Sequence, residues 1–148
     1  VEQLVREGYR EITLLGQNVN AFGIKEGTSL ANLMRSLDEV EGLSRIRFTT
    51  SHPRDMSVDL IRAMKDVTKV MPHFHLPMQS GSDAVLARMN RGYTRKEYAR
   101  WIEYLRDEIP GIAITTDLIV GYVGKHRKSS RNALGGRGVL FRWSLFVH

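Results

Sequence analysis

The sequence contains no cysteine, so the chain by itself forms no disulfide, no thiolate zinc site and no cysteine-ligated iron–sulfur cluster. No apolar run approaches the ~20 residues that a membrane-spanning helix needs. The first residues also lack the basic start and apolar core of a secretory signal. We therefore expect no membrane partner. Because the chain does not begin with methionine, we expect its true start to lie upstream.

Acidic residues are missing from the end of the chain. Residues 1–122 carry 16 basic and 16 acidic side chains, whereas residues 123–148 carry six basic side chains and no acidic one. The formal net charge of +6 therefore comes entirely from this last segment. We expect residues 123–148 to be a divergent basic tail that is either disordered or read out of frame. Any nucleic-acid affinity inferred from net charge would apply to this tail alone.

Residues 1–122 alternate short β-rich runs with amphipathic helical patterns. After an initial helix that stops near Gly8, strands are predicted at 12–15, 46–50, 73–76 and 112–120. Helices are predicted between them, beginning near Thr28 or Ser29, Ser57, Ser82 and Thr94, the last with Glu97 as a capping box. Strands separated by helices indicate a parallel sheet and an α/β fold.

The predicted strands end in polar residues. In parallel α/β folds such residues gather at one edge of the sheet, where ligands bind. Each has a simpler interpretation that the pattern leaves open, because Gln17 and Asn18 suit a turn, and Ser80 and Ser82 suit a loop and a helix cap. Asp117 favours a site, since a carboxylate inside an apolar strand is costly unless it is paired. The candidate residues are Gln17, Asn18, Ser51, Gln79, Ser80, Ser82 and Asp117.

Two histidines, His73 and His75, fall on one face of the third predicted strand. A metal pair is conceivable, but no third ligand is evident, and structural histidines are the favoured interpretation. The sequence also lacks the phosphate-loop, dinucleotide-binding and nucleophile-elbow patterns. The sequence pattern alone therefore predicts an α/β domain with polar strand ends and no particular activity.

Five ordered segments make the sequence similar to the radical-SAM methylthiotransferases. The resemblance covers about residues 1–122, and its first segment resembles the tRNA-modifying branch in particular. The segments are LGQNVN (15–20), FTTSHP (48–53), HLPMQSGS (75–82), MNRGYTR (89–95) and TDLIVG (116–121). The family pattern breaks after Gly121, which suggests a shifted reading frame.

The resemblance implies a partial radical-SAM (β/α) barrel that lacks the first strand and the cluster loop. Such enzymes use a 4Fe–4S cluster to cleave S-adenosylmethionine to a radical, and they add a methylthio group to C2 of an N6-isopentenyl-type adenosine. Implied partners are tRNA and a reductant protein, and the implied location is the cytoplasm. The cluster ligands are absent here, so we expect this chain alone to be inactive. An alternative is a non-catalytic remnant that binds S-adenosylmethionine or RNA.

The resemblance also assigns roles to individual residues. Gln79, Arg91 and Asp117 match polar contacts to S-adenosylmethionine, and Ser51 matches a polar residue near its amine. By position, Gln17 and Asn18 face the cofactor or the substrate, and Ser80 and Ser82 line the same edge. No residue of the chain is assigned a catalytic or metal-binding role.

Overall fold

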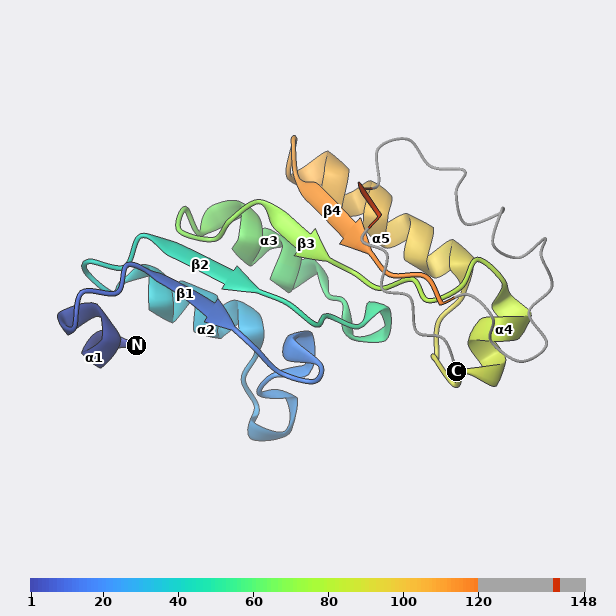
Figure 1. The fold of residues 1–148 in the computed structure, drawn as a ribbon, viewed down its shortest axis with the longest axis horizontal. Helices are drawn as coiled ribbons and strands as arrows, with labels where there is room; N and C mark the ends of the chain where they lie inside the picture. The colour runs from blue at the N-terminus through green and yellow to red at the C-terminus, as the bar shows by residue number, and fades with distance from the viewer. Residues whose placement is uncertain (120–139, 142–148) are drawn as a thin grey trace.

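The computed structural model describes residues 1–119 and 140–141. The expected alternation of strands and helices is confirmed (Figure 1). The helices are α1 (Glu2–Arg6), α2 (Leu30–Asp38), α3 (Val58–Asp66), α4 (Asp83–Arg88) and α5 (Arg95–Glu108). The strands are β1 (Glu11–Leu14), β2 (Arg45–Phe48), β3 (His73–His75), β4 (Ala113–Thr116) and β5 (Leu140–Phe141). Short 3-10 turns are η1 (Val19–Ala21), η2 (Ile24–Glu26) and η3 (Pro53–Asp55).

The main helices begin where hydroxyl side chains cap them. Ser29 and Ser57 accept hydrogen bonds from backbone N–H groups three residues on, at 3.2 and 3.1 Å. Thr94 and Glu97 form the predicted capping box at the start of α5. The prediction for Ser82 is wrong in one respect. Ser82 occupies the N-cap position of α4, but its side chain makes no capping hydrogen bond.

All strand pairs of the described residues are parallel, as predicted. In the first ladder Leu14 pairs with Phe48, and in the second His75 pairs with Thr115. A single bridge between Ile46 and Val70 joins β2 to the segment that leads into β3. Strand β5 adds to the far side of β4. Among the described residues, the ladders form two short sheets and no closed barrel.

The fourth strand is shorter than the predicted run 112–120. It ends at Thr116, and the chain then leaves the ladder to pair with Gln79 instead. The Gln79 N–H donates to the Asp117 carbonyl at 2.9 Å, and the Ile119 N–H donates to the Gln79 carbonyl at 3.0 Å. Asp117 therefore follows a strand rather than lying inside one. An apolar run cannot distinguish these cases, because an extended segment beside a strand is equally buried.

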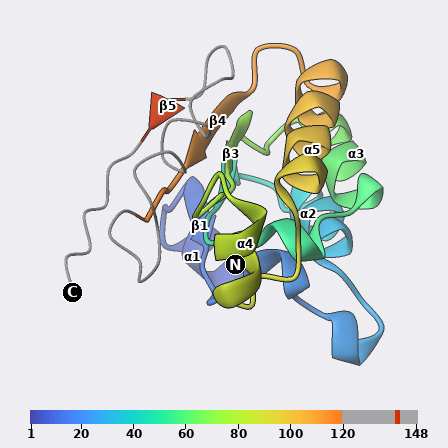
Figure 2. The same ribbon diagram turned by 90° about the vertical axis from the view of Figure 1, so that its right-hand side faces the viewer.

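Helices α2, α3 and α5 lie on one face of the strands, and no described helix covers the other face (Figures 1 and 2). The covered face is apolar, and the Phe48 and Phe74 rings meet edge to face at 5.2 Å between centroids. The bare face is charged at its amino end, where Glu11 pairs with Arg45 and Arg47 at 2.6 and 2.7 Å. Side chains with no exposed surface fill the core: Met34, Ile46, Ile61, Ala63, Phe74, Leu76 and Leu105. No helix among the described residues is long and apolar enough to cross a membrane.

Candidate cofactor site at the strand ends

The loops after β1 and β2 are joined by side-chain-to-backbone hydrogen bonds. Asn20, which is only 8% exposed, donates to the His52 carbonyl at 2.9 Å and accepts from the His52 N–H at 2.8 Å. The Thr50 hydroxyl donates to the Gly16 carbonyl, and the Val19 N–H donates to the Thr50 carbonyl at 3.2 Å. These bonds hold the carboxyl ends of the first two strands together.

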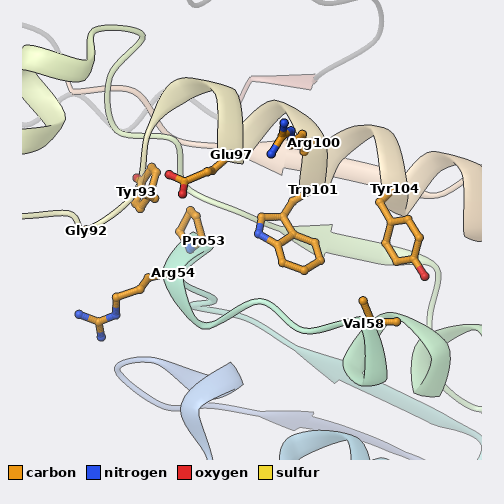
Figure 3. Close-up of a pocket in the computed structure, with 9 residues that line it drawn as sticks. All are labelled: Pro53, Arg54, Val58, Gly92, Tyr93, Glu97, Arg100, Trp101 and Tyr104. Carbon is orange, nitrogen blue, oxygen red and sulfur yellow. The ribbon is translucent and has the colours of Figure 1, made fainter.

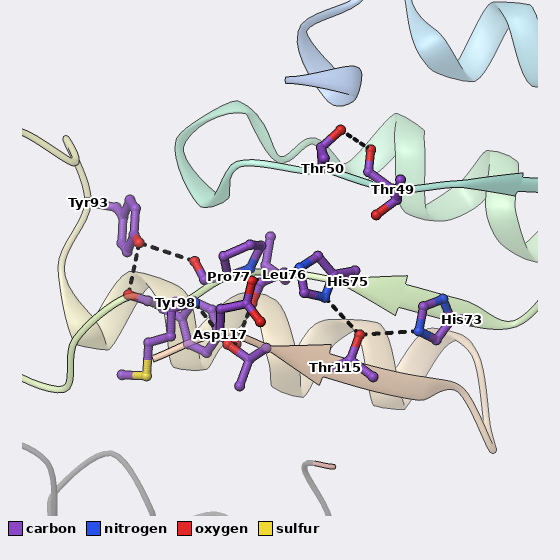
Figure 4. Close-up of polar contacts among 12 residues, drawn as sticks. Thr49, Thr50, His73, His75, Leu76, Pro77, Tyr93, Tyr98, Thr115 and Asp117 are labelled. Carbon is purple, nitrogen blue, oxygen red and sulfur yellow. Dashed lines mark hydrogen bonds and ion pairs between the residues drawn. The ribbon is translucent and has the colours of Figure 1, made fainter. Parts of the chain in front are cut away.

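Two tyrosines organise the loops after β3 and β4 (Figure 4). The Tyr93 hydroxyl donates to the Met78 carbonyl at 2.9 Å. The Tyr98 hydroxyl bonds to the Leu76 carbonyl at 2.9 Å and to Thr116 Oγ1 at 3.1 Å. Burial raises the pKa of each tyrosine to about 12, so both hydroxyls keep their protons at neutral pH.

The two halves of this strand-end region meet through an aromatic contact. The His52 and Tyr93 rings pack edge to face with centroids 5.5 Å apart. Burial lowers the pKa of His52, and the nearby positive charge of Arg54 lowers it further. The neutral His52 ring of the β2 loop therefore packs against Tyr93, which lies just before α5.

A polar cluster extends from the bare sheet face to Asp117. Thr115 Oγ1 lies 3.2 Å from His73 Nε2 and 2.9 Å from His75 Nδ1, so one hydroxyl bridges both rings (Figure 4). His75 Nε2 lies 3.3 Å from Asp117 Oδ2. Burial lowers the pKa of His73, and the neighbouring His75 contributes to the shift. Within residues 1–119 and 140–141, no three His, Asp or Glu side chains are grouped to hold a metal ion.

Buried polar atoms without a partner are concentrated at the predicted site. Five side-chain atoms of this kind occur in the described residues, and four belong to residues that the sequence singled out. They are Asn18 Oδ1, Ser51 Oγ, Arg91 Nε and Asp117 Oδ1; the fifth is Asp38 Oδ1. Asn18, Ser51 and Asp117 follow strands, whereas Arg91 lies between α4 and α5. Because buried polar groups are normally hydrogen-bonded, these unpaired atoms make the region a candidate ligand site.

The other predicted residues lie in the same loops with different exposure. Gln17 is exposed, whereas Gln79 is half-buried and has a φ of 64°, in the left-handed region. Ser80 has no exposed surface, and its Oγ accepts a hydrogen bond from the Ser82 N–H at 3.3 Å. Ser80 is therefore buried within the loop that follows β3, and Ser82 is half-buried beside it. Asn18 Nδ2 donates to Asp55 Oδ2, which fixes its amide in the loop.

Sequence reasoning missed the residues that position these loops. Asn20 and His52 were part of recognised segments without an assigned role, and Tyr98 was not singled out in the helix that begins near Thr94. The hydrogen bonds between Asn20 and His52, and those of Tyr98 to Leu76 and Thr116, span between 18 and 32 residues, so no local pattern reveals them. The available signal was the polar or hydroxyl character of side chains at otherwise buried positions.

Comparison with known proteins is consistent with this geometry. The sequence model of the Radical SAM superfamily matches residues 1–129. The chain is 59% identical over 127 residues to tRNA-2-methylthio-N(6)-dimethylallyladenosine synthase of Geobacter sulfurreducens, which covers 84% of this chain and 28% of the relative. It is 50% identical over 136 residues to the protein of the same name from Acetivibrio thermocellus. This match covers 90% of this chain and 28% of the relative.

A third relative of that name, from Desulfosudis oleivorans, is 56% identical over 122 residues, covering 82% of this chain and 26% of the relative. The chain thus spans under a third of the length of these curated relatives. The family resemblance carried by the five segments is confirmed, and the chain belongs to the radical SAM superfamily.

Proposed function

We propose that this chain is part of a tRNA methylthiotransferase that adds a methylthio group to C2 of an N6-isopentenyl-type adenosine. The supporting observation is the similarity to synthases that carry this modification in their name, at 59, 50 and 56% identity over more than four fifths of the chain. The proposal includes tRNA and a reductant protein as partners, and a cytoplasmic location.

We further propose that the fold is a partial (β/α) barrel. Among the described residues, the parallel strands carry helices on one face, and the other face bears charged and polar side chains such as Glu11, Arg47 and His75. In a barrel this face would point inward, and the strand ends would form one rim. Residues 123–148 remain a predicted divergent tail, and apart from Leu140–Phe141 they lie outside the described residues.

The residues at the strand ends fit S-adenosylmethionine. The cofactor carries an amine, a carboxylate and ribose hydroxyls, and it would supply the radical chemistry when bound. Asp117 Oδ1 is an unpaired acceptor suited to an amine or a hydroxyl, and Arg91 Nε is an unpaired donor suited to a carboxylate. Ser51 Oγ can donate or accept. Gln79 and Gln17 add amides at the same edge.

The residues do not fit an iron–sulfur cluster. The 148 residues include no cysteine, so this chain supplies no thiolate ligand. We propose that the isolated chain binds S-adenosylmethionine without turnover. The alternative of a non-catalytic binding remnant predicts the same affinity for S-adenosylmethionine. Anaerobic reconstitution with iron and sulfide tests whether the chain can hold a cluster. Cluster absorbance in the reconstituted chain would contradict our assignment.

Calorimetric titration with S-adenosylmethionine tests the binding proposal. A hydrogen bond to a charged group contributes about 1.5–3 kcal/mol, so Asp117→Asn should weaken binding by about tenfold or more. Asp38→Asn is a matched control, because Asp38 also carries an unpaired buried oxygen but lies at the end of α2. Equal affinities for the parent chain and Asp117→Asn, or no binding by the parent chain, would overturn the proposed site.

A further inference from the structure

A cavity lies on the helical side of the molecule, away from the bare sheet face. Its volume is about 500 Å³, and it lies between α5 on one side and η3 with the start of α3 on the other. Trp101 and Tyr104 project from α5 toward Val58 of α3 (Figure 3). The Trp101 and Tyr104 rings meet edge to face with centroids 6.4 Å apart. We call this cavity the outer pocket.

Two arginines, Arg54 and Arg100, and one glutamate line the outer pocket, and the segment that forms one of its walls is basic in sequence. Residues 88–100 contain five basic side chains and a single acidic one, although residues 1–122 as a whole are balanced. That acid, Glu97, is engaged in the helix cap, since its carboxylate accepts from the Thr94 N–H and hydroxyl at 2.7 and 2.8 Å. Arg54 from η3 lines the opposite end of the pocket from Tyr104, and its side chain is 57% exposed (Figure 3). Arg100 also lines the pocket.

Aromatic walls with arginines beside them suit a nucleotide. A base can stack on Trp101 or Tyr104 whatever its sequence, and exposed arginines attract the adjoining phosphates. A purely apolar peptide would gain nothing from the basic surroundings. The charge of the pocket therefore favours a polyanion that carries flat rings, which is the chemistry of a single-stranded nucleic acid.

Tyr93 connects the outer pocket to the strand-end site. Tyr93 forms part of its wall, while the Tyr93 hydroxyl bonds to the Met78 carbonyl next to Gln79. The Tyr93 ring also packs against His52. An RNA strand that delivers one base to the strand ends would therefore pass directly by this cavity.

We propose that the outer pocket binds one nucleotide of single-stranded RNA that flanks the modified base, with its base stacked on Trp101 and its phosphate near Arg54 or Arg100. The inference rests on the proposed function for the identity of the polyanion as RNA. It adds a contact on the helical side of the fold, apart from the strand-end residues and the basic tail.

Trp101 fluorescence provides a local test. The chain has two tryptophans, so Trp143→Phe leaves Trp101 as the only reporter. We expect a six-nucleotide adenosine RNA to quench Trp101 saturably, with an affinity that falls as salt rises. An abasic ribose-phosphate oligomer of the same length should bind about tenfold more weakly, because base stacking contributes much of the affinity. Equal quenching by the abasic oligomer would overturn the inference.

Variants of the pocket test the same claim by anisotropy of a labelled RNA. Trp101→Leu should weaken binding by about tenfold, whereas Trp101→Phe retains a stacking ring and most of the affinity. Arg54→Ser should lower the slope of log affinity against log salt by about 0.7, the value expected for one phosphate contact. Arg54 pairs with Asp55 at 3.2 Å. Arg35→Ser is the matched control, because Arg35 is also exposed and pairs with a carboxylate, that of Asp59.

Circular dichroism of each variant establishes that it is folded. RNA binding that is unchanged in both Trp101→Leu and Arg54→Ser would overturn the inference and leave the proposed function standing. Failure of the parent chain to bind S-adenosylmethionine in the calorimetric titration would instead count against the proposed function. The two failures are therefore distinguishable.

Discussion

Asn20 and His52 exchange two hydrogen bonds across the loops that follow β1 and β2, with N···O distances of 2.9 and 2.8 Å. The Asn20 side chain thus satisfies both backbone groups of His52. Because Ser51 precedes His52, this exchange also fixes the position of an unpaired hydroxyl of the candidate site.

Replacement of Asn20 should destabilise the fold measurably. Asn20→Ala removes both hydrogen bonds and leaves the buried loop with an unpaired His52 N–H, which costs about 1–3 kcal/mol of unfolding free energy. The His52 carbonyl still accepts a hydrogen bond from the Asp55 N–H at 3.1 Å. Urea denaturation measures this loss. Asn32→Ala is the control, since the Asn32 side chain is exposed and accepts a hydrogen bond from Arg35 on the same helix. A stability loss below that of Asn32→Ala would show that the exchange contributes nothing.

The buried tyrosines should make the protein sensitive to alkali. The pKa of Tyr98 is raised by burial from 10 to about 12, so the folded chain keeps a proton that the unfolded chain releases above pH 10. The corresponding stability is fully present below pH 10 and is lost as the pH rises toward 12. In Tyr98→Phe the unfolding free energy should therefore fall less steeply over this range.

Absorbance at 295 nm measures the same effect directly. The chain has five tyrosines, and we expect Tyr93 and Tyr98 to ionise last. Tyr98→Phe should remove one of the two late steps, whereas Tyr9→Phe, at an exposed position, should leave both late steps in place. Five tyrosines that ionise together near pH 10 would show that neither hydroxyl is buried as described.

The cap of α5 should contribute an acid-sensitive increment of stability. Hydrogen bonds from the Thr94 side chain and backbone lower the pKa of Glu97 below its ordinary value of 4.5. The stability that Glu97 adds is therefore present above pH 4.5 and is lost as the pH falls through its lower folded-state pKa. Thermal unfolding of Glu97→Gln should depend less on pH in this range. Thr94→Ser keeps the hydroxyl and should preserve the pH dependence of the parent chain. If Glu97→Gln and the parent chain show the same pH dependence, the capping carboxylate is not the source of that dependence.

The order of elements and their start points could be predicted because they depend on local chemistry. The hydroxyl caps at Ser29, Ser57 and Thr94 and the helical spacing of apolar residues are visible in short windows of sequence. The strand-end location of Ser51 followed from topology. Arg91 was proposed from family resemblance instead, since no local pattern marks a partly buried arginine with an unpaired Nε.

The errors arose where the structure depends on distant contacts. Strand β4 stops at Thr116, and Leu118 then forms an isolated parallel bridge with Gln79, which lies 39 residues earlier in the chain. Ser82 leaves α4 uncapped by its hydroxyl, and its N–H bonds to Ser80 Oγ instead. Periodicity identifies the buried face of a segment but cannot identify its hydrogen-bonding partner.

Amide chemical-shift mapping with S-adenosylmethionine tests the central claim most directly, because it locates the ligand on the chain. We predict perturbations at the residues that follow the strands, including Gln17, Ser51, Gln79 and Asp117, with those of α2 and α3 unchanged. The same titration of Asp117→Asn should require a higher ligand concentration for equal shifts. Perturbations confined to the helical side, or none at saturating ligand, would contradict the assignment of the strand ends as the cofactor site.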